Sequence, residues 1–138
     1  MAACQIQQHV RFQHCYPAAM VFYPRYFEMI NGMIEDWFDE GLGYGFDAMI
    51  VNGPHGVPLA HMDAEFKAPS RLDDMLDFTL VVRGLGRSSI KLTLTAWCGS
   101  DVRMIARPTL VFIDGPANKP IAIPPDLRAR MQSFEEKI

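Results

Sequence analysis

The sequence has 138 residues, a length that fits one domain with a core of its own. Hydrophobic residues make up 49% and charged residues 21%, which indicates a globular chain and excludes a disordered one. The net charge is −3 and the arginines are scattered, so a nucleic-acid partner is excluded. No stretch is apolar over the length of a membrane span, and residues 1–10 lack the features of a signal peptide. We therefore expect a cytoplasmic protein without a membrane partner.

The first predicted elements are a strand and a long helix. Residues 5–12 alternate loosely between apolar and polar side chains and predict a strand. A turn follows, and Pro24 fits the first turn of a helix. From Tyr26 to Phe38 apolar side chains recur at helical spacing, and Gly41 follows as a C-terminal stop. This helix has one strongly apolar face, which another layer must cover.

The second half of the chain predicts that covering layer. Two loops rich in glycine and proline, GLGYGFD and VNGPHGVP, precede four segments that alternate between apolar and polar residues. These four predicted strands span residues 58–67, 75–83, 89–97 and 102–113. Pro108, inside the last of them, predicts a bulge or an edge position. A short C-terminal helix is expected to begin near Pro125.

The order of elements predicts the fold class. One long helix against one antiparallel sheet is an α+β solution. We expect the hotdog fold, in which an antiparallel sheet of about five strands wraps around one long helix, as a single domain over residues 1–138. A lone sheet of this kind leaves an edge strand, so dimerisation through a continued sheet is expected.

Motifs of several other enzyme classes are missing from the sequence. GLGYGF follows a helix and has Phe46 in place of a third glycine, so a dinucleotide site is rejected. The four histidines lack metal-ligand spacing, and we expect neither a metal nor a redox cofactor. What remains is the helix start, where the amides of residues 21–23 could polarise a carbonyl group as an oxyanion hole does. The alternative is that Phe22 and Tyr23 only fill core space behind a tight turn.

Residues 12–27 carry a resemblance to a known family. They read FQHCYPAAMVFYPRYF and resemble the N-terminal motif of hotdog-fold acyl-CoA thioesterases of the 4-hydroxybenzoyl-CoA thioesterase branch. That motif runs F-x-D-x-D-P-A-G, often with His at the first Asp, and continues into an aromatic helix start. The resemblance extends through Pro58, Phe66 and Asp74 to IPPDL at residues 123–127. It implies hydrolysis of an acyl-CoA thioester, with CoA as part of the substrate, by a homodimer or homotetramer.

The resemblance also implies roles for individual residues. The backbone amide of Tyr23 would bind the thioester carbonyl, and Asn31 would face the acyl pocket. Arg87, Ser89 and Lys119 would contact the phosphates of CoA. The alternative for Arg87 is an ordinary turn charge, and for Lys119 a solvated loop charge.

The chain departs from the family motif at two positions. Tyr16 stands where the family has its essential carboxylate, and Ala19 replaces the glycine. A carboxylate is ionised and basic at neutral pH, whereas a phenol stays protonated. Ala19 would tighten the turn if the backbone there needs a positive φ. Two functions stay open, an acyl-CoA or aryl-CoA thioesterase acting at a dimer interface and an acyl-CoA or aromatic-ligand binding protein with little or no hydrolysis. A hotdog dehydratase is a third alternative, which the lack of a convincing Asp/His hydratase motif disfavours.

Other residues could take the place of the missing carboxylate. His14 titrates in a suitable range for a base, and its alternative is a hydrogen-bonded turn histidine. His61 and Asp63 could meet the helix start of a dimer partner and contact its substrate, and their alternative is a solvated outer sheet face. Tyr16 itself could donate a hydrogen bond to the thioester or to a water. A wall that suits an aromatic or medium-length acyl group is formed by Phe22, Tyr23, Tyr26 and Phe27.

Overall fold

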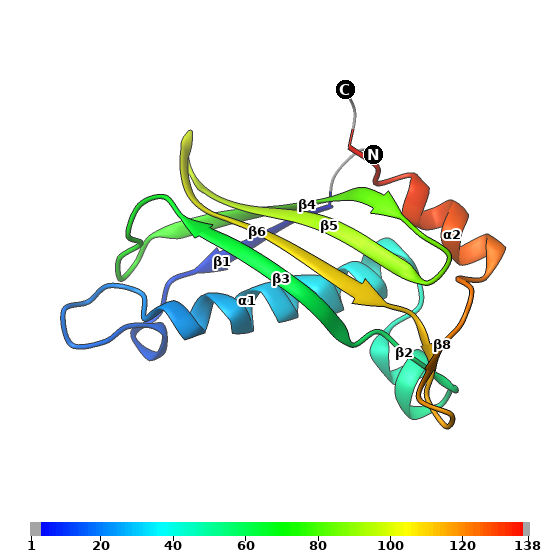
Figure 1. Cartoon of the computed structure of the whole chain (residues 1–138). Coiled ribbons are helices and arrows are strands. Elements are labelled where there is room, and N and C mark those ends of the chain that lie inside the picture. The colour runs from blue at the N-terminus through cyan, green and yellow to red at the C-terminus, as the bar shows by residue number, and fades with distance from the viewer. Residues whose placement is uncertain (1–3, 137–138) are drawn as a thin grey trace.

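One antiparallel sheet curving over one long helix makes up the body of the computed structural model, which describes residues 4–136 (Figure 1). The sheet order is β1-β4-β5-β6-β3. Its strands are β1 (Cys4–His9), β3 (Leu59–Phe66), β4 (Met75–Leu85), β5 (Ser89–Cys98) and β6 (Asp101–Val111). The helices are α1 (Tyr23–Asp36) and α2 (Pro125–Gln132). The predicted α+β hotdog arrangement of five strands and one long helix is confirmed.

Helix α1 forms where the apolar pattern predicted it. Pro24 occupies its first turn, where a missing N–H costs nothing, and a π-helical turn, η2 (Trp37–Gly41), continues the helix to the expected glycine stop. Its buried face comprises Tyr26, Met29, Ile30, Met33 and Ile34, followed by Trp37 and Phe38 of η2. The helix is therefore held by burial of one face under the sheet.

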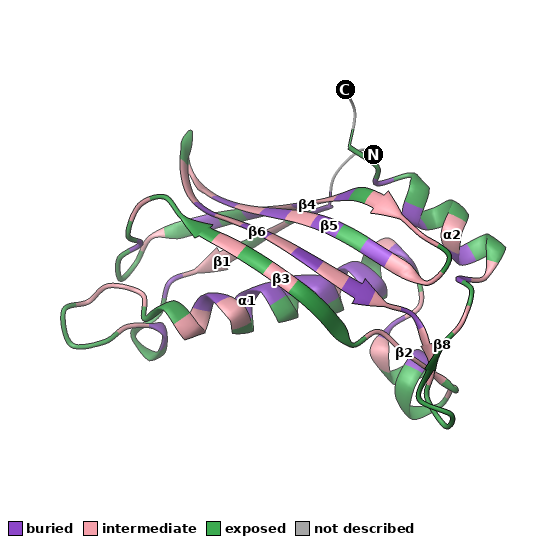
Figure 2. Cartoon of the chain, in the orientation of Figure 1, coloured by how far each residue is buried: buried purple, intermediate pink, exposed green. Residues whose placement is uncertain are grey.

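Alternate strand positions supply the other half of the core. Along β4 and β5 the buried side chains are Leu76, Phe78, Leu80, Val82, Ile90, Leu92, Leu94 and Ala96. Figure 2 shows this alternation of buried and more exposed positions along the strands. Each large apolar side chain buried in this way stabilises the fold by about 1.5–3 kcal/mol.

Two local features differ from the sequence prediction. Strand β1 ends at His9 rather than near residue 12, because a short 3-10 turn, η1 (Phe12–His14), forms where the Arg11 N–H donates to the His14 ring. The predicted loop between α1 and β3 contains a π-helical turn, η3 (Asp47–Val51). These corrections shorten the first strand and order part of the loop.

The edge or bulge position predicted for Pro108 is wrong. Strand β6 lies between β5 and β3, and Pro108 faces Met62 of β3 in regular register. On the β5 side, pairing is interrupted between the Lys91–Thr109 and Leu94–Ala106 pairs, which are three residues apart on both strands. A central strand thus accommodates the proline, with pairing to β5 interrupted beside it and the register to β3 shifted between Leu59 and His61.

The two edges of the sheet differ in whether another segment pairs along them. On the β1 side, the segment after α2 pairs with β4 beyond the last β1 pair, Cys4–Leu80. Val82 N–H donates to Phe134 O (2.8 Å), and Glu136 N–H donates to Val82 O (2.9 Å). Within residues 4–136, strand β3 pairs only with β6, and Leu59 and Phe66 on it are 53% and 47% exposed. Strand β3 is therefore the open edge of the sheet.

A second, small sheet lies beyond the end of β6. It consists of β2 (His55–Gly56), β7 (Ile113–Asp114) and β8 (Lys119–Pro120), in the order β2-β7-β8. It stands at the end of the molecule away from the turn that precedes α1 (Figure 1). In the part of the chain that the structure describes, no helix is long and apolar enough to cross a membrane.

Candidate active site

The turn between β1 and α1 is closed by its own backbone. Cys15 and Val21 form a bridge, Tyr16 N–H donates to Met20 O (3.1 Å), and Ala19 N–H donates to Tyr16 O (2.9 Å). Ala19 has φ of +62°, a left-handed conformation that favours glycine. The positive φ that the replaced glycine suggested is therefore present, and an alanine adopts it.

The loop between β3 and β4 holds this turn from outside. Val21 N–H donates to Ser70 O and Leu72 N–H donates to Ala19 O, both at 2.9 Å. Inside the core, Tyr26 Oη lies 2.7 Å from Ser70 Oγ, and burial raises the pKa of this phenol. The turn and the first helical residues are thus anchored to one loop.

Arg103 of β6 fixes that loop in turn. Its Nη1 lies 2.7 Å from Asp74 Oδ2 and 3.0 Å from Pro69 O, and its Nε lies 2.6 Å from Asp101 Oδ2. Burial would raise the pKa of Asp74, but hydrogen bonds from Arg71 N–H and from Arg103 outweigh it and lower that pKa. Sequence reasoning missed this cluster, because its members come from separate segments with no common spacing.

The start of α1 offers a backbone donor. Phe22 N–H donates to His14 O (2.9 Å), Pro24 has no N–H, and Arg25 N–H donates back to Phe22 O (2.8 Å). Among residues 4–136 the Tyr23 N–H finds no acceptor. An N–H at the positive end of a helix is suited to an oxygen that gains negative charge. The carbonyl-binding role of Tyr23 stays a prediction.

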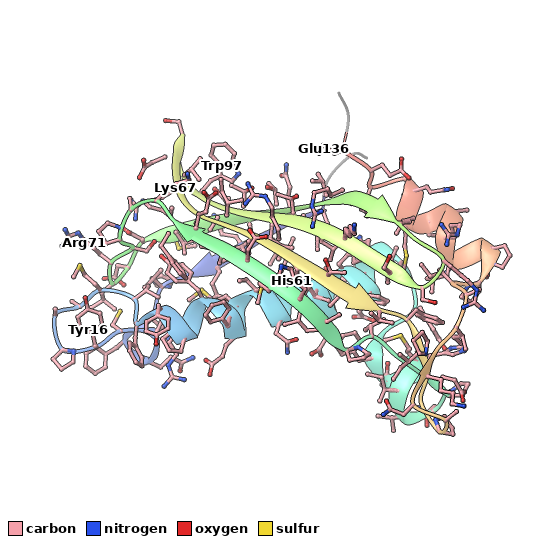
Figure 3. All side chains as sticks on the ribbon, viewed as in Figure 1. Tyr16, His61, Lys67, Arg71, Trp97 and Glu136 are labelled. Atoms are coloured by element: carbon pink, nitrogen blue, oxygen red, sulfur yellow. The ribbon has the colours of Figure 1, made fainter. Side chains whose placement is uncertain are left out.

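Three of the predicted residues meet at this helix start. The rings of Tyr16 and Phe22 pack edge to face with centroids 6.4 Å apart, and those of Phe22 and Tyr23 lie 5.4 Å apart. All three side chains are exposed. Tyr16 lies at the same end of the molecule as Arg71 (Figure 3). The structure therefore places the ring of Tyr16 in an exposed aromatic cluster with the rings of Phe22 and Tyr23.

His14 lies behind this turn as a hydrogen-bonded histidine. Its side chain is buried, its Nδ1 accepts the Arg11 N–H at 2.8 Å, and burial lowers its pKa. In the neutral ring this arrangement leaves the proton on Nε2. His14 is therefore set up as a donor at Nε2.

His61 and Asp63 lie apart from the turn within one chain. Met62 and Ala64 pack against the core, so the alternation of a strand turns His61 and Asp63 to the opposite face. Asp63 Oδ1 lies 3.1 Å from Arg107 Nη1 on that outer face. Figure 3 shows His61 midway along β3, away from Tyr16.

The residues predicted to contact CoA lie at the other end of the molecule. Strand β4 begins at Met75, opposite His9, and its 11 residues span roughly 33 Å. Arg87 and Ser89 follow its far end, and Lys119 lies in β8 of the small sheet beyond β6. Within one chain, these residues therefore lie about one strand length away from Tyr23.

A large cavity opens between the middle of α1 and the open edge of the sheet. It has a volume of about 590 Å³. Helix α1 lines it with Phe27, Ile30, Asn31 and Ile34, and the rest of the wall comes from the loop containing η3 and from β2, β3, β6 and β7. Asn31 thus faces a pocket, as its predicted role requires. The helical spacing of the four α1 residues was readable in the sequence, whereas the other walls were not.

The described residues contain no group of three or more His, Cys, Asp or Glu side chains arranged to hold a metal ion.

The Thioesterase-like superfamily profile matches residues 8–131 of the chain. The chain belongs to this family. The predicted family and the predicted enzyme class, thioester hydrolase, are thereby confirmed.

Three known proteins are similar to this chain over most of its length. The 4-hydroxybenzoyl-CoA thioesterase of Pseudomonas sp. strain CBS-3 is 24% identical over 132 residues, covering 88% of this chain and 92% of the relative. A 1,4-dihydroxy-2-naphthoyl-CoA thioesterase from Synechocystis superposes with a TM-score of 0.85 at 17% identity, covering 94% and 96%. A Staphylococcus aureus protein in complex with CoA superposes with a TM-score of 0.84 at 12% identity, covering 97% and 86%.

Proposed function

We propose that this chain hydrolyses an acyl-CoA or aryl-CoA thioester to a free acid and CoA. The observation that carries the proposal is the Tyr23 N–H at the start of α1, which has no acceptor among residues 4–136 and lies beside an exposed aromatic cluster. Membership of the thioesterase-like superfamily and the CoA-related relatives support the same conclusion.

In the proposed reaction the thioester oxygen accepts the Tyr23 N–H. As hydroxide adds to the carbonyl carbon, this oxygen gains negative charge, which the amide and the helix end stabilise. The C–O bond forms, the C–S bond breaks, and the proton of the new carboxylic acid passes to the CoA thiolate. The chain contributes positioning and charge stabilisation to each step.

Because Tyr16 stands in place of the family's carboxylate, the nucleophile cannot be supplied by a carboxylate at this position. Its phenol replaces a carboxylate that would be ionised at neutral pH, and the basic Nδ1 of His14 already accepts the Arg11 N–H. Hydroxide from solvent then supplies the nucleophile, while Tyr16 Oη orients it by a hydrogen bond. The rate should therefore rise with pH across the neutral range, without the early plateau that a carboxylate base gives.

The complete site is proposed to form between two copies of the chain. The far placement of Arg87, Ser89 and Lys119 supports this arrangement, because a second copy could bring them to the thioester held by Tyr23. The open edge at β3 supports pairing of copies through a continued sheet, as a homodimer or a homotetramer. A cytoplasmic location stays a prediction.

Thiol release from a panel of acyl-CoA and aryl-CoA esters tests the proposal. The wild type should turn over slowly with a rate that rises with pH. Tyr16→Asp should raise kcat about 100-fold and flatten the pH profile above about pH 5, because it restores an ionised base. Tyr16→Phe is the control that removes the hydroxyl alone.

A second function is favoured by Tyr16 itself, namely binding of an acyl-CoA or aromatic ligand without efficient hydrolysis. Tight CoA binding together with no turnover of any ester would establish this function and exclude the thioesterase. Turnover that is unchanged in Tyr16→Phe and Tyr16→Asp would show that the aromatic cluster is not the reacting site.

A further inference from the structure

The cavity begins on α1 about one helical turn after Tyr23. Phe27, the first α1 residue in the cavity wall, is four residues after Tyr23 and therefore on the same face of the helix. Phe66 of the open strand packs on Phe27 with ring centroids 6.3 Å apart. The wall then follows α1 to Ile34. A group attached to a carbonyl at Tyr23 would enter the cavity beside Phe27.

The length of this path separates two kinds of acyl group. Four residues from Tyr23 to Phe27 rise roughly 6 Å along the helix, and eleven residues to Ile34 rise roughly 16 Å. A hydroxybenzoyl group reaches roughly 6 Å from its carbonyl carbon to its ring oxygen, given ordinary bond lengths. The hydroxybenzoyl group would therefore end at the mouth of the cavity, beside Phe27. A straight chain advances roughly 1.3 Å per carbon, so about 12 carbons would reach the level of Ile34.

The lining favours hydrocarbon over a hydroxylated ring. Among the described lining residues only Asn31 and His55 have polar side chains. Nδ1 of His55 lies 2.7 Å from Tyr44 Oη, and its ring packs on Phe112 with centroids 4.8 Å apart, so His55 is engaged by the wall. A buried hydroxyl without a partner is unfavourable, whereas methylene groups gain from burial.

We propose that this cavity of about 590 Å³ is the acyl chamber and that it selects a straight aliphatic acyl group of about 12 carbons. The inference rests on the proposed function, since it takes the carbonyl to be held at Tyr23. It assigns the cavity to substrate rather than to a side chain of a second copy.

The first test is kcat/KM for straight-chain acyl-CoA esters from four to 16 carbons, with benzoyl-CoA and 4-hydroxybenzoyl-CoA alongside. Values should rise about fourfold per methylene once the chain passes Phe27, and level off near 12 carbons. Calorimetric titration of free dodecanoate and free benzoate gives a reading without turnover, and dodecanoate should bind at least tenfold more tightly.

A matched pair of variants tests whether the acyl chain of the substrate lies in the cavity. Ile50 lines the cavity and is 48% exposed, whereas the adjacent Val51 is 78% exposed and outside the lining. Ile50→Trp should lower the dodecanoyl-to-butyryl ratio of kcat/KM at least tenfold, and Val51→Trp should leave that ratio unchanged. Leu59→Trp with Ala60→Trp is a second pair on β3, in case Ile50→Trp does not fold.

The failures are distinguishable from one another. Preference for the aryl esters, or a profile that ignores chain length, would overturn the chamber and leave the thioesterase intact. Equal ratios in Ile50→Trp and Val51→Trp would overturn the chamber, because the acyl chain would then lie outside the cavity. No turnover of any ester would end the proposed function, and the dodecanoate titration would still decide what the cavity binds.

Discussion

Replacing Arg103 by Met should loosen the active-site turn from a distance. The variant keeps most of the side-chain length and removes the charge that holds Asp74, Asp101 and Pro69 O. Arg103 and Asp74 keep only 16% and 25% of their side-chain surface exposed, so solvent can replace the lost bonds only in part. Breaking a well-formed, partly buried pair of this kind should cost about 2 kcal/mol.

The assay is thermal and kinetic together. For a chain of this size the melting temperature should fall by roughly 5–8 °C. Because the loop bonded to Val21 and Ala19 shifts, kcat should fall about tenfold while KM changes less. Arg103→Lys is the matched control, which keeps the charge and loses the second bond, and it should recover part of both quantities.

Acid titration checks the same reasoning. The pKa of Asp74 is lowered in the folded state, so its contribution to stability is present above its unfolded pKa of about 3.9 and is lost as pH falls below that value. The wild type should therefore lose more stability between pH 5 and pH 3 than Arg103→Met. A loss under about 0.5 kcal/mol in Arg103→Met at pH 7, with kcat unchanged, would refute the anchoring role.

Three further outcomes are expected. Burial lowers the pKa of His14, so protonation opposes folding, and wild-type stability should decline as pH drops below about 6.5 while His14→Asn stays flat; parallel denaturation curves would contradict this. Ala19→Gly should stabilise the fold by about 0.5–1 kcal/mol, because it relieves a left-handed alanine, and a lower melting temperature would argue against strain at φ of +62°. Phe66→Lys should reduce the mass in sedimentation from twice the 15.6 kDa of one chain to that of one chain, whereas Val51→Lys should not; an unchanged mass for Phe66→Lys would remove β3 from the interface.

The sequence alone determined the architecture, because local periodicity encodes it. Apolar side chains at helical spacing along residues 26–38 and strict alternation along residues 89–97 can each bury a face in only one way. The order of the elements is then compatible with one arrangement of layers, a long helix packed against one antiparallel sheet. The turn motif at residues 12–27 likewise located Tyr23 at the helix start, since Pro24 allows little else.

Only the tertiary structure decided which distant residues meet. Arg103 anchors the turn through Asp74, 29 residues away, and no spacing announces such a contact. Pro108 looked like an edge residue until the sheet order placed β6 inside, where strand pairing rather than composition sets the position. The separation of Arg87 from Tyr23 and the length of the cavity along α1 also follow from packing, because each depends on how strands and helix are laid against one another in space.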